Sequence, residues 1–192
     1  MTLLGDELAT AAAALRSLEV DFALVGGLAV SARSEPRFTR DADLAVAVAD
    51  DAGAEALVFA LRSLGYEVLG TVEHETTGRL ATARLGRPGA GRSAVVDLLF
   101  ASSGIEPEIT AAAETMDVLP GVTIPVASTG HLIALKLLST VDARPQDAPD
   151  LRSLAEVATD TDWEAAAVAV GLITLRGYAR GRDLPAALTA LR

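Results

Sequence analysis

Asp41 and Asp43 are two carboxylates separated by one residue, directly before the apolar run Leu-Ala-Val-Ala-Val. On a β-strand, residues i and i+2 point to the same face, so this spacing places the two carboxylates close together. Such groups repel each other unless a cation lies between them, and Mg²⁺ with the oxygens of a bound triphosphate suits such a pair. The pair predicts a site for a metal-bound nucleotide, although two solvated acids at the start of a strand give the same pattern.

Gly26 and Gly27 follow an apolar run at residues 20–25 that predicts a strand, and they precede a segment that predicts a helix. A strand that ends in a glycine turn before a helix exposes backbone N–H groups and the positive helix end, which together favour a phosphate. A tight turn that needs glycine only for its backbone conformation is the alternative. We expect the two glycines to bind nucleotide.

Asp97 lies inside the apolar run at residues 94–100, Ala-Val-Val-Asp-Leu-Leu-Phe. A buried carboxylate without a partner is costly, so this side chain should lie at an edge or in a site. We expect it beside Asp41 and Asp43 as a third acid. The three together could bind the metal and activate a hydroxyl for in-line attack on the α-phosphorus of a nucleotide, with pyrophosphate as the leaving group.

The first half of the chain, with its glycine pair, Asp41-x-Asp43 and a later strand carrying Asp97, resembles the nucleotidyltransferase superfamily, also called the polymerase-beta-like fold. The resemblance implies an α/β core with a mixed sheet, followed by a C-terminal helical portion. We expect residues 1–104 to form the nucleotidyltransferase core and residues 105–192 to pack on it as a mainly helical portion of one compact unit.

The second half resembles a narrower group, the AbiEii/AbiGii family of MenT-like toxins from toxin–antitoxin systems, through residues 131–136 (HLIALK) and 144–151 (RPQDAPDL). The resemblance implies that Lys136, Asp147 and Asp150 pack against the nucleotide site. Lys136 could hold a triphosphate as a point charge, and either aspartate could orient it. A surface lysine and helix-capping aspartates are the alternatives, and the spacing does not choose between Asp147 and Asp150.

Thr39 and Arg40 precede the first acid of the pair. Related toxins carry a Ser or Thr two residues before that acid, beside the triphosphate, and the resemblance places Thr39 and Arg40 in the nucleotide-binding segment. Phosphorylation of Thr39 would add about two negative charges where the nucleotide binds and would switch the enzyme off. We therefore treat Thr39 as a possible regulatory phosphorylation site.

Hydrophobic periodicity and turn residues predict the order of elements along the chain. Helices are expected at residues 5–18, 28–34 and 50–64, with further strands at 42–48, 67–72, 79–86 and 94–100 and a hairpin turn at 86–91. Beyond residue 102 the pattern is mainly helical, with helices at 130–140, 149–158, 163–178 and after 183, and with a short strand-like stretch at 123–126.

The composition limits the classes of function. The chain has 192 residues, no cysteine and a formal net charge of −10, so thiol chemistry is excluded and a general nucleic-acid coat is disfavoured. No apolar run is long enough to cross a bilayer, and the N-terminus lacks a basic signal region, so we expect a cytoplasmic protein without membrane contact. Arginines gather near the glycine turn and the following strands, where they could be solvated or could contact RNA phosphates: Arg33, Arg37, Arg40, Arg79, Arg84, Arg87 and Arg92.

Two histidines, His74 and His131, lack the spacing of metal ligands, and we expect them at the surface and at the start of a helix, respectively.

The family resemblance implies a Mg²⁺-dependent nucleotidyltransferase that moves a nucleoside monophosphate from an NTP, often a pyrimidine NTP, to the 3′ end of tRNA. That reaction blocks aminoacylation and translation, and a cognate antitoxin is the implied partner. Transfer to a small molecule or a protein, and a non-catalytic nucleotide-binding regulatory module, are the alternatives.

Overall fold

The computed structural model describes residues 3–39, 41–75, 77–88, 95–139 and 146–192. Within these ranges the sheet has seven strands in the order β3-β4-β5-β2-β1-β7-β6. β1 pairs parallel with β7, β2 pairs parallel with β5, and the other neighbours are antiparallel, so the sheet is mixed. The strands are β1 (Phe22–Val25), β2 (Asp41–Val46), β3 (Glu67–Glu73), β4 (Leu80–Gly86), β5 (Val95–Leu99), β6 (Glu114–Leu119) and β7 (Val122–Val126).

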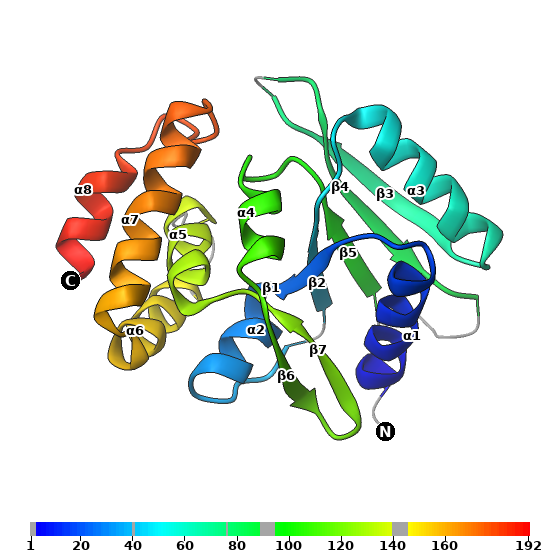
Figure 1. Ribbon diagram of the computed structural model, residues 1–192, viewed down its shortest axis with the longest axis horizontal. Coiled ribbons are helices and arrows are strands. Elements are labelled where there is room, and N and C mark those ends of the chain that lie inside the picture. The colour runs from blue at the N-terminus through cyan, green and yellow to red at the C-terminus, as the bar shows by residue number, and fades with distance from the viewer. Residues whose placement is uncertain (1–2, 40, 76, 89–94, 140–145) are drawn as a thin grey trace.

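Helices surround this sheet, and Figure 1 shows α5 to α8 gathered on one side of the molecule, away from β3, β4 and α3. The described helices are α1 (Leu3–Ser17), α2 (Gly26–Arg33), α3 (Asp51–Ser63), α4 (Glu106–Ala111), α5 (Thr129–Ser139), α6 (Asp147–Val157), α7 (Asp160–Leu175) and α8 (Leu184–Leu191). The predicted α/β class, with a mixed sheet and helices toward the C-terminus, is confirmed.

The centre of the sheet forms the core of the protein. Leu24 of β1, Leu44 of β2 and Leu98 of β5 are at most 1% exposed, and the four residues of β1 are all buried. Burial of such apolar side chains is the main favourable contribution to folding, and it fixes which face of each strand points inward. The strands that carry the predicted acids are therefore the most firmly held part of the sheet.

Side-chain caps define where two of the helices begin. The Asp50 side chain accepts a hydrogen bond from the backbone N–H of Gly53 at the start of α3. Thr159 and Asp162 form a capping box at the start of α7, in which each side chain binds the backbone N–H of the other residue. Such caps satisfy N–H groups that have no partner within the helix.

The structure differs from the predicted order of elements in the middle of the chain. Residues 114–119, expected within a mainly helical region, form strand β6, because their polar and apolar residues alternate and pair with β7 at the edge of the sheet. The turn expected at residues 86–91 lies largely outside the described residues, although β4 and β5 pair antiparallel as such a turn requires. The division into portions at residue 104 stays a prediction, and strands from both portions belong to the sheet.

Candidate active site

The predicted acids meet in one cleft. Asp41 and Asp43 lie on the same face of β2, and Asp97 of β5 pairs in register with Asp43. All three line a cleft of about 660 Å³. The structure thus brings the third acid beside the pair, while the chemical roles of the three remain predictions.

The electrostatics of the cluster are unfavourable for a charged Asp43. The pKa of Asp43 is raised to about 6, chiefly by burial and then by the neighbouring carboxylates of Asp97 and Asp41, while Lys136 and Arg84 act in the opposite direction. Removal of a carboxylate from water and the repulsion of nearby like charges both favour its protonated form. An added cation between the carboxylates would relieve this repulsion.

Arg84 of β4 is a member of this site that the sequence did not single out from the other arginines. Its Nε and Nη2 donate to the two carboxylate oxygens of Asp97 at 2.8 and 2.6 Å, and Nη2 lies 3.9 Å from Oδ2 of Asp41. The hydrogen bonds from Arg84 to Asp97 raise the pKa of the guanidinium above its ordinary value. In β4 the buried residues alternate with less buried ones, which places Thr82 and Arg84 on one face of the strand. This alternation in the sequence could have indicated that Arg84 faces the cleft.

The glycine turn lies directly against the acids. Gly26 has a φ of 66°, and a Cβ at this position would overlap the carboxylate of Asp43. A Cβ on Gly27 would lie 2.9 Å from the Cζ of Arg37. Both positions line the cleft at the N-terminal end of α2, and at Gly26 glycine is required for close approach as well as for backbone conformation.

Lys136 faces the cleft from α5, and its side chain is only 12% exposed. Its Nζ lies 2.9 Å from Oδ1 of Asp147 and 2.7 Å from Oδ2 of Asp150. Both aspartates are on α6 and are buried, at 3% and 2% exposure, and neither is among the residues that line the cleft. The two acids therefore bind the ammonium group of the lysine without lining the cleft themselves.

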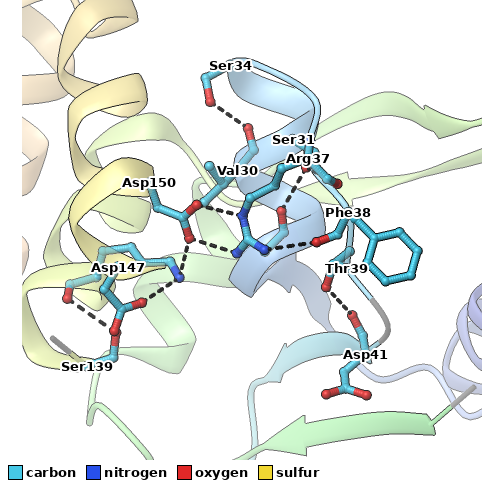
Figure 2. Close-up of polar contacts among 12 residues, drawn as sticks. Val30, Ser31, Ser34, Arg37, Phe38, Thr39, Asp41, Ser139, Asp147 and Asp150 are labelled. Atoms are coloured by element: carbon cyan, nitrogen blue, oxygen red, sulfur yellow. Dashed lines mark hydrogen bonds and ion pairs between the residues drawn. The ribbon is translucent and has the colours of Figure 1, made fainter. Parts of the chain in front are cut away.

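Asp150 also binds Arg37, which lies in the segment between α2 and β2. Nη2 of Arg37 donates to Oδ2 of Asp150 at 2.8 Å, and Nε lies 2.6 Å from Oδ1. Figure 2 shows Arg37 between Asp150 on one side and the carbonyl of Phe38 on the other. This network joins α6, the lysine helix and the segment that leads into Asp41.

Thr39 lines the cleft, and its Oγ1 donates to the backbone carbonyl of Asp41 at 3.4 Å. Its hydroxyl therefore lies next to the backbone of the first acid, while its predicted contact with the triphosphate stays a prediction. Arg40 lies outside the described residues.

The arginines near the cleft are not a free basic patch. Each described member of the predicted set forms an ion pair with an acid of the chain: Arg33 with Glu114, Arg37 with Asp150, Arg79 with Asp51, Arg84 with Asp97 and Arg87 with Glu7. Arg92 lies outside the described residues. Contact with RNA phosphates by these side chains would have to coexist with, or replace, these ion pairs.

The two histidines lie away from the cleft lining. The expectation that His74 is a surface residue was wrong, because the residue is 6% exposed and its ring packs against Tyr178 at a centroid distance of 4.3 Å. His131 lies in the first turn of α5 and is buried, with Nδ1 2.8 Å from Oγ of Ser128. Burial lowers the pKa of both imidazoles.

A metal can be accommodated by two of the acids. Mg²⁺ commonly takes one or two protein carboxylates and completes its shell with water and substrate phosphate, which fits Asp41 and Asp43. Asp97 gives both of its oxygens to Arg84 in this arrangement. Over the described parts of the chain, no group of three acids or histidines has the arrangement of a complete protein metal site.

Comparison with known proteins shows the family. The profile described as "Nucleotidyl transferase AbiEii toxin, Type IV TA system" matches residues 9–190, nearly the whole chain. The chain belongs to the AbiEii family. Nucleotidyl transfer and a toxin role in a toxin–antitoxin system are therefore its function in outline. No curated protein sequence matches this AbiEii-family chain.

Solved structures share the fold of this AbiEii-family protein. An antigenic nucleotidyltransferase-like protein from Paracoccidioides brasiliensis has 20% identity and a TM-score of 0.54, over 97% of this chain and 92% of that one. The solution structure of the antibiotic-resistance factor ANT(2'')-Ia has 17% identity and a TM-score of 0.55, over 98% and 95% of the two chains. A crystal structure of ANT(2'')-Ia with adenylyl-2''-tobramycin has 18% identity and a TM-score of 0.50, over 98% of each chain. At these identities the likeness shows the nucleotidyltransferase fold alone.

Several other residues of the cleft gave no signal in the sequence. Ser102 and Ser103 follow β5, and Arg180 follows α7 and donates to the carbonyl of Ser102. Their approach depends on the packing of the C-terminal helices, which a local pattern does not encode.

No helix within the described ranges has the length and apolar character needed to cross a bilayer.

Proposed function

We propose that this AbiEii-family protein transfers a nucleoside monophosphate from an NTP to an acceptor hydroxyl, with Mg²⁺. The observation that carries this proposal is the convergence of Gly26, Asp43 and Lys136 on one cleft. In the reaction, the acceptor oxygen forms a bond to the α-phosphorus, the bond between that phosphorus and the β-phosphate oxygen breaks, and pyrophosphate leaves.

The residues of the cleft divide these tasks. Gly26 and Gly27 let the triphosphate approach the N-terminus of α2, where backbone N–H groups and the helix dipole favour an anion. Asp41 and Asp43 are the carboxylates that would hold Mg²⁺, which when bound would stabilise the charge that develops on the phosphate oxygens. Asp97 lies beside them and would help to receive the proton of the attacking hydroxyl once Arg84 releases one of its two oxygens.

Lys136 is proposed to bind the triphosphate as a point charge. The buried Asp147 and Asp150 hold its ammonium group toward the cleft, and both are therefore proposed as positioning residues. Because Asp150 also binds Arg37, it would fix the lysine relative to the segment that leads into the metal-binding acids.

The proposed acceptor is the 3′ end of tRNA, and a pyrimidine NTP is the proposed donor. Addition of a nucleotide there would block aminoacylation and stop translation, which is consistent with a toxin. The family description names a nucleotidyl transferase toxin of a toxin–antitoxin system, which supports transfer as the toxic reaction and a cognate antitoxin as the partner.

Transfer to a small molecule or a protein is the second candidate, and a specific observation favours it. The described arginines of the predicted set are engaged in ion pairs, and the formal net charge is −10, which disfavours a polyanionic acceptor. A small acceptor would need no such cations.

We also propose that phosphorylation of Thr39 switches the enzyme off. Its hydroxyl lies in the cleft lining, next to the backbone of Asp41. A phosphate there would place about two negative charges in the space proposed for the triphosphate.

The test is incubation of the purified protein with Mg²⁺ and each α-labelled NTP in turn, in separate reactions with total tRNA, with a protein extract and with a small-molecule extract as the acceptor. Label on tRNA that is lost in both Asp41→Ala and Lys136→Ala supports the tRNA proposal. Label on protein or on a small molecule would keep the transfer reaction and change the acceptor. No label on any acceptor class, with wild-type protein that is folded and unmodified, would contradict nucleotidyl transfer.

A further inference from the structure

Arg84 places a positive charge inside the row of acids that line the cleft. The registers of β4, β5 and β2 put Arg84 opposite Asp97 and Asp97 opposite Asp43, so these residues form one row across three neighbouring strands. The guanidinium binds both oxygens of Asp97 and lies 3.9 Å from Asp41. An arginine of the chain thus stands next to the carboxylates that would attract a divalent cation.

These contacts act against binding of a metal in two ways. A carboxylate that accepts two hydrogen bonds from one guanidinium must give up or share them before it can coordinate a metal. The guanidinium also repels a divalent cation at Asp41 and Asp43, since the charges would be only a few ångströms apart. Lys136, which lines the same cleft, adds a second positive charge that acts on Asp43.

We propose that Arg84 is an internal counter-ion of the acid cluster that weakens the binding of free divalent metal. The carboxylates are then partly neutralised when no nucleotide is present, and the metal binds mainly together with the phosphates of an NTP. This inference rests on the proposed function only in that the metal is the one that transfer would use.

The experiment measures Mn²⁺ binding to the full-length protein without nucleotide or acceptor, from the electron paramagnetic resonance signal of free Mn²⁺. Arg84→Met removes the charge and keeps an unbranched side chain, and it should tighten the Kd for Mn²⁺ by about tenfold, because nearby charges interact on this scale even in a high dielectric. The matched control is Arg79→Met, which loses the same charge from an ion pair with Asp51 outside the cleft lining and should keep the wild-type Kd.

Two further variants make the result specific to this cluster. Asp43→Asn in the Arg84→Met background should abolish the gain in affinity. Arg84→Lys, whose ammonium cannot form the two parallel bonds to Asp97, should give a Kd between those of wild type and Arg84→Met, and it also serves if the methionine variant does not fold. A wild-type Kd in the folded Arg84 variants, or an equal gain in Arg79→Met, would overturn the inference.

The outcome is independent of the acceptor. If Arg84→Met binds Mn²⁺ more tightly but the wild type transfers label to no acceptor, the counter-ion inference stands and the proposed reaction is rejected. If the wild type transfers label but the Arg84 variants bind Mn²⁺ as the wild type does, the proposed reaction stands and the counter-ion inference is rejected.

Discussion

The carboxylate of Asp43 fills the space that a side chain at position 26 would occupy, directly against the backbone of Gly26. The glycine turn and the acid pair are therefore one structural unit, although residues 27–42, which include all of α2 beyond its first residue, separate Gly26 from Asp43 in the sequence. In the proposed complex, the backbone of the turn would reach a phosphate held at the acids because no Cβ separates the two.

Gly26→Ala should disable the site. The new Cβ would overlap the Asp43 carboxylate, and the φ of 66° would strain an alanine, so we expect a stability loss of about 1–3 kcal/mol and a loss of transfer of about a hundredfold or more. Urea unfolding and the labelled-NTP assay measure the two effects. Gly171→Ala is the control, because this glycine lies in α7 with open space around it. Alanine there should raise the free energy of unfolding by about 0.5–1 kcal/mol. Wild-type transfer by Gly26→Ala would refute the close approach.

Asp43→Asn should stabilise the metal-free protein at high pH. The pKa of Asp43 is raised to about 6 from 3.8, so between these values the folded state holds a proton that the unfolded state has lost. Its contribution to stability is therefore favourable below pH 4 and is lost as pH rises through about 6. Asparagine avoids the cost of ionisation, and we expect a gain of about 1–3 kcal/mol at pH 8 that disappears at pH 4.

Thermal unfolding in EDTA at the two pH values measures this difference. The exposed Asp21 provides the matched control, since Asp21→Asn should have the same unfolding temperature as the wild type at both pH values. A gain that is equal at pH 4 and pH 8 would show that the ionisation of Asp43 is not its cause. In the wild type, transfer of label should rise with pH through about 6, because metal binding needs the ionised carboxylate.

Asp150→Asn should destabilise the protein and displace Lys136. The variant leaves the guanidinium of Arg37 without its buried carboxylate and removes one of two acids from Lys136, and breaking such a pair costs about 3–5 kcal/mol. Urea unfolding should show this loss, and the folded variant should have a raised KM for the NTP. Asp160→Asn is the control, because that side chain is 94% exposed, and its stability should not change measurably. Equal stability of the two variants would contradict a structural role for Asp150.

The sequence predicted much of the fold because the strands that carry the acids are also the buried core. The runs around Leu24, Leu44 and Leu98 have the continuous apolar character of central strands, and their order places Gly26, Asp43 and Asp97 near one another. The edge strand β6 was missed, since it is short, its apolar face is only partly buried, and its residues fit a helical region equally well.

The roles of the charged residues were harder to predict, because an ion pair depends on which elements meet in space. Arg37 and Asp150 are more than a hundred positions apart, yet the half-buried arginine forms an ion pair with the buried aspartate that no local pattern indicates. Arg84 likewise read as one surface arginine among several, and only the register of β4 with β5 shows that it binds Asp97. Asp147 and Asp150, which the spacing could not separate, both bind Lys136.

Thr39→Glu should block binding of the NTP. The carboxylate would place a negative charge in the cleft beside the segment that leads into Asp41, where it would repel the triphosphate and compete for Lys136. We expect transfer of label to fall at least tenfold, on the order of one lost charge interaction, while Thr39→Ala keeps near-wild-type transfer and escapes any control that acts by phosphorylation. Thr189→Glu, at an exposed position of α8, is the matched control for the added charge and should transfer label as the wild type does. Full transfer by Thr39→Glu, or normal antitoxin control of Thr39→Ala in cells, would reject Thr39 as the switch.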